Sequence, residues 1–321
     1  MIKVPKELEE FFHDEEFPVK PTARYISLVI LRETQSETIF RTDEMLSKEL
    51  TNLSFSNNEE VSRVILTKRK VIAPERRTGR EFLRAYGLIP EDCNINGSMC
   101  GECIDCLTYG FAGAEQSEKS KGALKSRVLS ENSYSVLPAS EITDTRTINA
   151  LSEQGTMMEI SENKKGEKEF AMRQSLASNE YVKPGVHFVD IETLHDIRKV
   201  EFVYVLGNIM LTKRYGAISS RLGKISNEIL AIVGSNSEIF STLELVKATY
   251  DKLSNTVHPL NKEELKKAAM EAFNDLMKKH FVKHFILTGQ ELENLLEEVK
   301  KIYKDPKSLA EEIKNLKSWN N

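Results

Sequence analysis

The residues best suited to chemistry are four cysteines that lie close together in the sequence. Cys93, Cys100, Cys103 and Cys106 are the only cysteines of the chain, and the last three follow one another at every third position. Thiolate sulfurs are soft ligands that suit zinc, and four of them form a closed tetrahedral site. The spacing of the last three also occurs around iron–sulfur clusters. We predict a structural Zn²⁺ held by these cysteines, with an iron–sulfur cluster or no metal as the alternatives.

The sequence leaves the fourth ligand of this site open. Histidine often joins cysteine in zinc sites, and His13, His187 and His195 are available to replace Cys93. A catalytic zinc is not expected, because it would need an open coordination position and a nearby acid–base group.

Lysine and arginine gather in three segments, although the whole chain carries a net charge of −4. Basic side chains on loops bind phosphates without reading the base sequence, whereas the plain alternative is a solvated charged face. The predicted RNA contacts, with Arg146 added from a separate polar stretch, are Lys68, Arg69, Lys70, Arg76, Arg77 and Arg80; Lys119, Lys121, Lys125 and Arg127; and Lys213, Arg214 and Arg221. We expect the three segments to converge on one face of the fold.

Sequence motifs of the common enzyme classes are absent. The chain lacks the phosphate-binding loop, the dinucleotide-binding glycines, the serine nucleophile elbow and the zinc-protease helix motif. Acidic residues are plentiful, but no pair stands out for acid–base catalysis. Asp43, in a polar loop after the first predicted strand, is the one acid kept as a candidate catalytic residue. We expect a non-catalytic binding protein, with a metal-dependent or acid-assisted nuclease as the alternative.

The composition is that of an ordinary soluble protein. The chain has 321 residues, of which 40% are hydrophobic and 29% are charged, and this suggests about two domains or one domain with insertions. No apolar run approaches the roughly 18 residues of a membrane span, and the N-terminus has no signal-peptide core. Cytoplasmic localisation without membrane contact is therefore expected.

The hydrophobic pattern predicts both strands and helices. Residues 24–32, 126–137 and 186–191 are predicted strands, and residues 202–211 fit a buried strand or a buried helix. Residues 80–86 have helical spacing, and residues 142–173 form a polar excursion, expected to be an extended hairpin. Helical periodicity covers most of the C-terminal third, over residues 243–253, 262–280, 288–303 and 305–316.

Several short motifs follow one another in an order that resembles a known family. They are PERRTGREFLR at 74–84, CLTYGFA at 106–112 with SRV at 126–128, TRTINA at 145–150 with GTMM at 155–158, PGVHF at 184–188, and the glycine-bounded segment 216–223. Over residues 20–230 the chain resembles the backbone subunit of type I-D CRISPR surveillance complexes, the Cas-seven family in its Csc-two form.

This resemblance implies an α+β fold with an RRM-like (ferredoxin-like) core. The core would be discontinuous, over residues 20–90 and 126–230, with a zinc-binding insertion and loop at 91–125. A thumb or lid hairpin would cover 142–173, and a helical region 240–318. No aromatic-rich RNA-binding signature lies on a predicted strand, so stacking of bases on the sheet is not expected.

The resemblance also implies the partners. Several copies would coat a single-stranded guide RNA as a filament, together with other CRISPR subunits and the target DNA strand that pairs with the guide. Met157 and Met158 are candidate wedges at the thumb, and the alternative is that they pack against the subunit's own core. Backbone subunits of the similar type III complexes cleave RNA with an acid after the first strand, and this keeps Asp43 in the nuclease alternative.

Overall fold

A computed structural model shows the arrangement of the chain. It describes residues 2–13, 16–18, 20–42, 45–95, 97–112, 122–149, 158–162, 168–172 and 176–316. No helix in these ranges is both long enough and apolar enough to cross a membrane.

A large antiparallel sheet forms the centre of the molecule. Its strands are β1 (Tyr25–Thr34), β2 (Lys48–Asn52), β3 (Glu60–Leu66), β6 (Val128–Ser130), β7 (Ser133–Ser135), β12 (His187–His195), β13 (Ile225–Ser235) and β14 (His284–Leu287). Their order across the sheet is β14-β13-β1-β12-β7-β3-β2, and β6 also pairs with β12. Strand β1 lies at the centre between β12 and β13, and all of these pairs are antiparallel. The mixed α+β fold expected from the sequence is confirmed.

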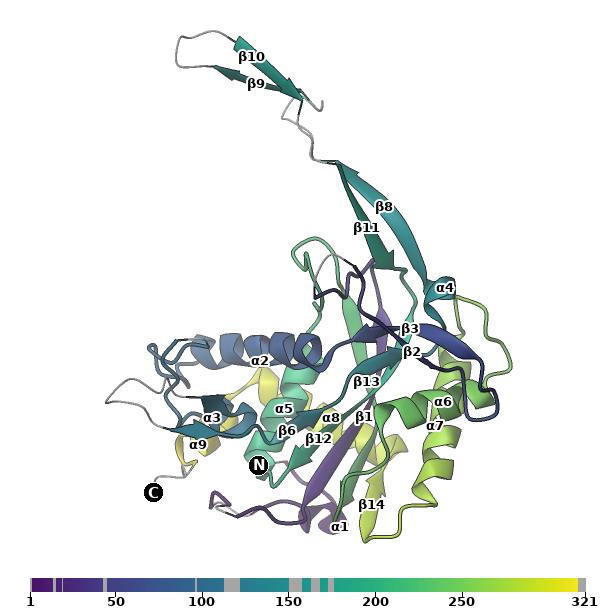
Figure 1. Cartoon of the computed structure of the whole chain (residues 1–321). Helices are drawn as coiled ribbons and strands as arrows, with labels where there is room; N and C mark the ends of the chain where they lie inside the picture. The colour runs from purple at the N-terminus through teal and green to yellow at the C-terminus, as the bar shows by residue number, and fades with distance from the viewer. Residues whose placement is uncertain are drawn as a thin grey trace.

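Helices cover both faces of this sheet (Figure 1). The helices are α1 (Lys6–Glu9), α2 (Lys68–Ala85), α3 (Ile104–Tyr109), α4 (Ala139–Ile142), α5 (Lys199–Leu211), α6 (Thr242–Lys252), α7 (Lys262–Met277), α8 (Gly289–Lys304) and α9 (Lys307–Lys314). Successive side chains of a strand point to opposite faces. Ile26, Leu28 and Ile30 of β1 pack in the core shared with α5, α8 and α9. Val29 and Leu31 pack in the core shared with α6 and α7. The middle of the sheet is therefore buried on both sides.

A long antiparallel hairpin projects from this body (Figure 1). Strands β8 (Thr143–Asn149) and β11 (Leu176–Val182) pair from Thr143↔Val182 to Asn149↔Leu176. Farther out, β9 (Met158–Glu162) pairs with β10 (Lys168–Met172). The excursion predicted at 142–173 is thus a hairpin whose return strand continues to Val182. A smaller pair, β4 (Phe111–Ala112) with β5 (Ala123–Leu124), lies beside α3.

Three predicted elements differ from the structure, and one of them is the strand predicted at 126–137, which is divided into β6 and β7. Helix α2 begins at Lys68, not at residue 80, and it contains Pro74. Proline removes one helical hydrogen bond and usually ends a helix, but the ring of Pro74 is buried here on the inner side of α2. The C-terminal third, predicted as helical only, also contributes the edge strand β14. Residues 202–211, which fitted two structures, belong to the buried helix α5.

A buried cluster of charges joins α2 to the sheet. The Arg32 guanidinium donates from Nε to Asp190 at 2.7 Å, from Nη1 to Glu75 at 2.9 Å and from Nη2 to Glu192 at 2.5 Å. All four side chains are fully buried, and one oxygen of each carboxylate lacks a hydrogen-bond partner. Burial is the main cause that raises the pKa of Glu192 well above its usual value of 4.5, and the charge of Glu75 is the second cause. Burial likewise raises the pKa of Glu75.

These raised pKa values predict a pH-dependent stability. A carboxyl whose pKa is higher in the folded state favours folding below about pH 4.5, and this contribution is lost as the pH rises through the folded pKa. Glu192→Gln cannot ionise, so the variant should match the wild type near pH 5. At pH 8 the variant should be more stable than the wild type, because its amide cannot take on a buried charge. Urea unfolding at both pH values measures the free energy of unfolding of the variant and of the wild type, with Glu293→Gln, a change at an exposed residue, as control. The same difference between Glu192→Gln and the wild type at pH 5 and pH 8 would contradict this prediction.

Candidate metal centre and arginine groove

The four cysteines converge at one point beside α3. Cys103 is the residue that precedes α3, Cys106 lies within it, and Cys93 and Cys100 come from the loop between α2 and α3. The Sγ atom of Cys93 lies 3.7 Å from that of Cys106 and 4.0 Å from that of Cys103, and Cys100 lies 3.9 Å from Cys106. All four sulfurs are within 4.8 Å of one another, and none is in a disulfide.

These distances fit a single tetrahedral ion. A zinc–sulfur bond of about 2.3 Å places tetrahedral ligand sulfurs about 3.8 Å apart. A cluster of several irons would stand between its ligands and force some of the sulfurs farther apart than they are here. The geometry therefore favours one ion over the iron–sulfur cluster that the spacing left open.

No histidine is needed as a ligand. His13 and His195 both contact Asp196, at 3.1 and 3.3 Å, and His187 lies 3.9 Å from Glu33. In the described part of the chain, the four cysteines are the one group of potential ligands that converges.

The thiols also interact strongly with one another. Hydrogen bonding with Cys100 is the main cause that lowers the pKa of Cys93, and hydrogen bonding with Cys103 is the main cause that lowers the pKa of Cys100 to about 6. The same contacts raise the pKa values of Cys103 and Cys106. Four thiolates this close repel each other unless a cation lies between them, so the donor set suits a divalent ion.

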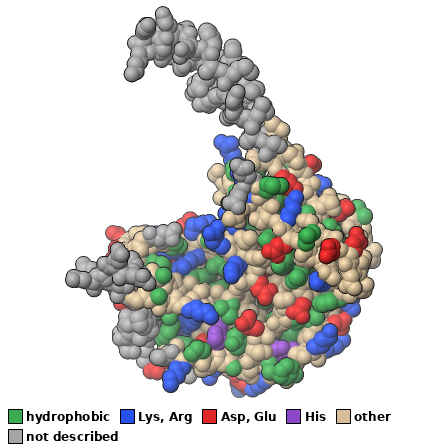
Figure 2. Space-filling model, in the orientation of Figure 1, with side chains coloured by type: hydrophobic (Ala, Val, Ile, Leu, Met, Phe, Trp, Pro, Cys, Tyr) green, Lys and Arg blue, Asp and Glu red, His purple; other side chains and the backbone are tan. Residues whose placement is uncertain are grey.

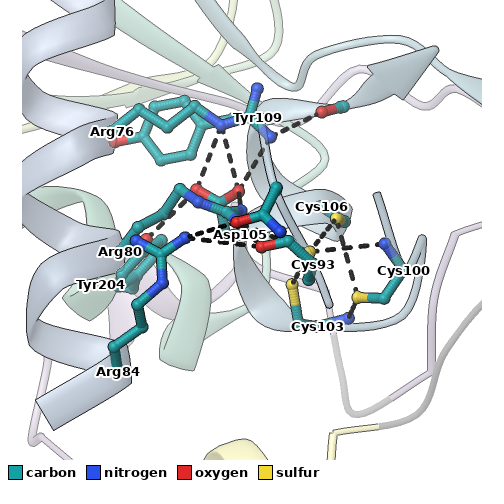
Figure 3. A network of polar contacts seen from close by, with 12 residues as sticks. Arg76, Arg80, Arg84, Cys93, Cys100, Cys103, Asp105, Cys106, Tyr109 and Tyr204 are labelled. Atoms are coloured by element: carbon teal, nitrogen blue, oxygen red, sulfur yellow. Dashed lines mark hydrogen bonds and ion pairs between the residues drawn. The ribbon is translucent and has the colours of Figure 1, made fainter. Parts of the chain in front are cut away.

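Arginines of α2 lie along one side of this centre (Figure 3). Asp105, fully buried between two of the cysteines, accepts from Arg76 Nη2 at 2.8 Å and from Arg80 Nη1 at 2.5 Å. Arg80 also donates to the carbonyl oxygen of Cys93 and lies 3.5 Å from its sulfur. Arg84 approaches the same carbonyl at 3.5 Å. Helix α2 and the cysteine loop are thus joined mainly through arginines.

An open groove of about 650 Å³ runs between α2 and the cysteine loop. Its lining consists of Arg69, Ile72, Ala73, Arg76, Arg77, Arg80, Glu81, Arg84, Asn94 and Ile95. Arg76 and Arg80 are paired with Asp105, and the remaining arginines of the lining, Arg69, Arg77 and Arg84, give the groove a positive charge. Arg69, Arg77 and Arg84 are exposed, and within the described residues neither Arg69 nor Arg77 forms an ion pair. The groove is therefore able to bind phosphate groups.

Three of the predicted RNA contacts are instead held inside the fold. Arg80 is 1% exposed, and Arg76 is bound on its guanidinium edge by Asp105. Arg127 is 8% exposed; it forms an ion pair with Glu201 and donates to the carbonyl oxygen of Leu107 at 3.0 Å. These internal bonds count against direct RNA contact by Arg80 and Arg127, because a guanidinium group already bonded inside the fold has few donors left for a phosphate. Arg76 keeps only its outer edge toward the groove.

The other predicted contacts have different positions. Lys68, Lys70 and Lys125 are exposed or half-buried, and Lys213, Arg214 and Arg221 are exposed. Arg214 donates to the carbonyls of its own loop, and the exposed Arg146 pairs with Glu37 at the base of the hairpin. Asp43, Lys119, Lys121 and Met157 lie outside the described residues, as does the side chain of Met158.

Described parts of the second and third basic segments lie near α2. Tyr215, from the third segment, donates to Glu75 of α2 at 2.8 Å. Arg76 donates to the Gly110 carbonyl at 2.9 Å, and Gly110 in turn lies against the backbone of residues 124–126. Figure 2 shows Lys and Arg side chains over this region and at the base of the hairpin.

Two important residues were not predicted from the sequence. Arg84 lines the groove, and its signal is the spacing 69, 76, 77, 80 and 84, which repeats along one face of a helix. Asp105 carried no such signal, because an acid between two metal ligands is also common on exposed loops.

The fold is similar to those of known CRISPR proteins. The crystal structure of Csc2 from Thermofilum pendens superposes with a TM-score of 0.65 at 18% identity, covering 97% of this chain and 91% of that one. Two further likenesses are weaker. A chain of a type IV-B CRISPR complex has a TM-score of 0.42 at 11% identity, covering 63% of this chain and 90% of that one. A chain of a CRISPR RNA-guided surveillance complex has a TM-score of 0.46 at 8% identity, covering 81% of this chain and 87% of that one. Only the Csc2 structure bears on the fold.

Sequence comparison gives the family. No curated protein sequence matches the chain. The family model described as "Csc2 Crispr" matches residues 11–313, which is nearly the whole chain. The protein therefore belongs to the Csc2 family of CRISPR proteins.

Proposed function

We propose that this protein is a guide-RNA-binding backbone subunit of a type I-D CRISPR surveillance complex. Several copies would assemble along one RNA, beside other subunits and the target DNA strand that pairs with the guide. The observation that carries this proposal is the arginine groove of α2 in a chain of the Csc2 family. A backbone subunit must accept any guide sequence, and a row of arginines binds phosphates whatever the bases.

The arrangement of the core supports an RRM-like assignment. In chain order, β1, α2, β6 with β7, β12, α5 and β13 follow the β-α-β-β-α-β order of ferredoxin-like folds. Because α6 and α7 cover the sheet face opposite α2 and α5, bases would not stack on the middle of the sheet. The RNA backbone would instead follow α2, which spans about 22 Å from Arg69 to Arg84, and the exposed loop with Lys213 and Arg214.

The hairpin and the metal centre complete the proposed subunit. The β8–β11 hairpin would act as the thumb, with Met157 and Met158 as wedges between bases. The four cysteines would hold a structural Zn²⁺, which would fix the loop that forms one wall of the groove. A closed set of four thiolates leaves no position for a substrate, and this supports a non-catalytic role.

The triple variant Arg69→Ala, Arg77→Ala and Arg84→Ala tests the proposal. Three lost phosphate contacts should lower the affinity for single-stranded RNA at least tenfold and reduce the log–log salt slope by about 2. Fluorescence anisotropy with a labelled oligouridine at several salt concentrations measures both quantities.

The matched control removes three exposed positive charges elsewhere. Lys267→Ala, Lys278→Ala and Lys300→Ala lie on α7, at its end and on α8, far in sequence from the groove. The control should bind as the wild type does. Equal loss of affinity in both triple variants would show only a general charge effect and would contradict the proposed surface.

A further inference from the structure

Asp105 and Arg80 form a direct connection between the metal centre and the arginine groove. Asp105 lies in α3 between the ligands Cys103 and Cys106 and is fully buried. Besides the two arginines, it accepts from the Tyr204 hydroxyl at 3.3 Å. A single carboxylate thus anchors two arginines of the groove to α3, which contains Cys106 and begins directly after Cys103.

Arg80 reaches the centre from the other side. One end of its guanidinium binds Asp105, and the other end binds the Cys93 carbonyl and lies 3.5 Å from the Cys93 sulfur. Four thiolates around a divalent cation carry a net charge of about −2. A buried guanidinium needs such compensation, because an unpaired charge in the interior is strongly unfavourable. Arg80 is therefore placed to balance both the carboxylate and the metal centre.

The same loop forms the far wall of the groove. Asn94 and Ile95, directly after Cys93, line the groove opposite α2, and Arg84 lies 3.4 Å from the Asn94 side-chain oxygen. Movement of Cys93 would therefore change the width of the groove and the positions of Arg76, Arg80 and Arg84 together.

We infer that Arg80 and Asp105 are positioning residues which couple metal occupancy to the shape of the arginine groove. The metal-loaded centre holds the groove open for a phosphodiester strand, and loss of the metal releases its wall. This regulation rests on the proposed function of the groove, whereas the link between the two residues and metal retention does not.

The role of Arg80 and Asp105 in holding the metal is tested without RNA, by measuring metal retention. Protein loaded with Co²⁺ is titrated with a chelator, and the thiolate-to-cobalt absorption reports the metal that remains bound. Arg80→Lys and Asp105→Asn should each weaken retention about 10- to 100-fold, the usual effect of removing an outer partner of a metal ligand. The matched control is Arg63→Lys, which alters another buried arginine that donates to carbonyl oxygens, those of Ser135, Val136 and Leu53. Retention equal to wild type in both variants would overturn the coupling, and an equal loss in Arg63→Lys would reduce it to general destabilisation.

The effect of metal occupancy on the groove is tested by measuring RNA binding. Wild-type protein stripped of metal should bind an oligouridine about tenfold more weakly than the loaded protein, and restored Zn²⁺ should recover the affinity. Unchanged affinity after stripping would overturn the regulation. If the loaded wild type itself fails to bind, the proposed function is wrong and the regulation with it, while the chelator titration still decides the role of Arg80 and Asp105.

Discussion

Cys106→Ser is expected to abolish metal binding and to unfold the loop and helix α3 around it. Structural zinc contributes roughly 10–16 kcal/mol in isolated zinc-finger peptides, which exceeds the stability of most domains. Among the described residues of 93–112 only α3 and β4 are regular, so the sulfur–metal bonds add to the packing of α3 and to the ion pairs of Asp105 as supports of the segment. The large sheet has its own cores on both faces and should stay folded. The change is therefore a local unfolding with loss of one metal equivalent.

Metal analysis, near-ultraviolet circular dichroism and limited proteolysis measure this result. Chelation of the wild type should reproduce it. Ser98→Ala is the matched control, because it removes a 2.8 Å hydrogen bond to the Asp92 carbonyl within the same loop and keeps all four sulfurs. A Cys106→Ser protein that retains one tightly bound metal and resists proteolysis as the wild type does would contradict a four-cysteine site.

Arg32→Met is expected to destabilise the whole protein by about 3–5 kcal/mol. The substitution removes the cation and leaves Glu75, Asp190 and Glu192 buried together without a counter-charge. Breaking one side of a buried ion pair costs this much, because the remaining charge has neither water nor a partner. Since Arg32 lies on the central strand β1, the loss affects the entire sheet.

Urea unfolding followed by circular dichroism measures the free energy of unfolding of this variant. The added substitution Glu192→Gln removes one ionisable carboxyl from the cluster, so at pH 8 the double variant should recover part of the loss. A double variant less stable than Arg32→Met alone would show that the carboxylates are not the cause. Wild-type stability in Arg32→Met would show that this charge cluster does not stabilise the fold.

The sequence predicted those features that depend on local spacing. The cysteine positions indicated the ligand set, because metal ligands must lie close together whatever the surrounding fold. The apolar, β-branched run at 24–32 predicted β1, which the structure places at residues 25–34 in the centre of the sheet. The C-terminal helices were predicted because each has one apolar face.

Other features depend on contacts between distant residues and could not be predicted in this way. Residues 202–209 are buried on every side, so their pattern has neither the period of a strand nor that of an amphipathic helix. The first half of α2 could not be predicted from the sequence, because a proline such as Pro74 normally ends a helix. The role of Arg80 depends on Asp105, 25 positions away, and it became visible only with α3 packed against α2.

We propose that single-stranded RNA binds along α2 and the adjoining basic loops. It is tested most directly by photocrosslinking a 4-thiouridine RNA to the metal-loaded protein and identifying the crosslinked peptides by mass spectrometry. We expect crosslinks in residues 68–84 and 213–224, with further crosslinks in the hairpin. Crosslinks confined to α6–α9, over residues 242–314, would contradict the claim.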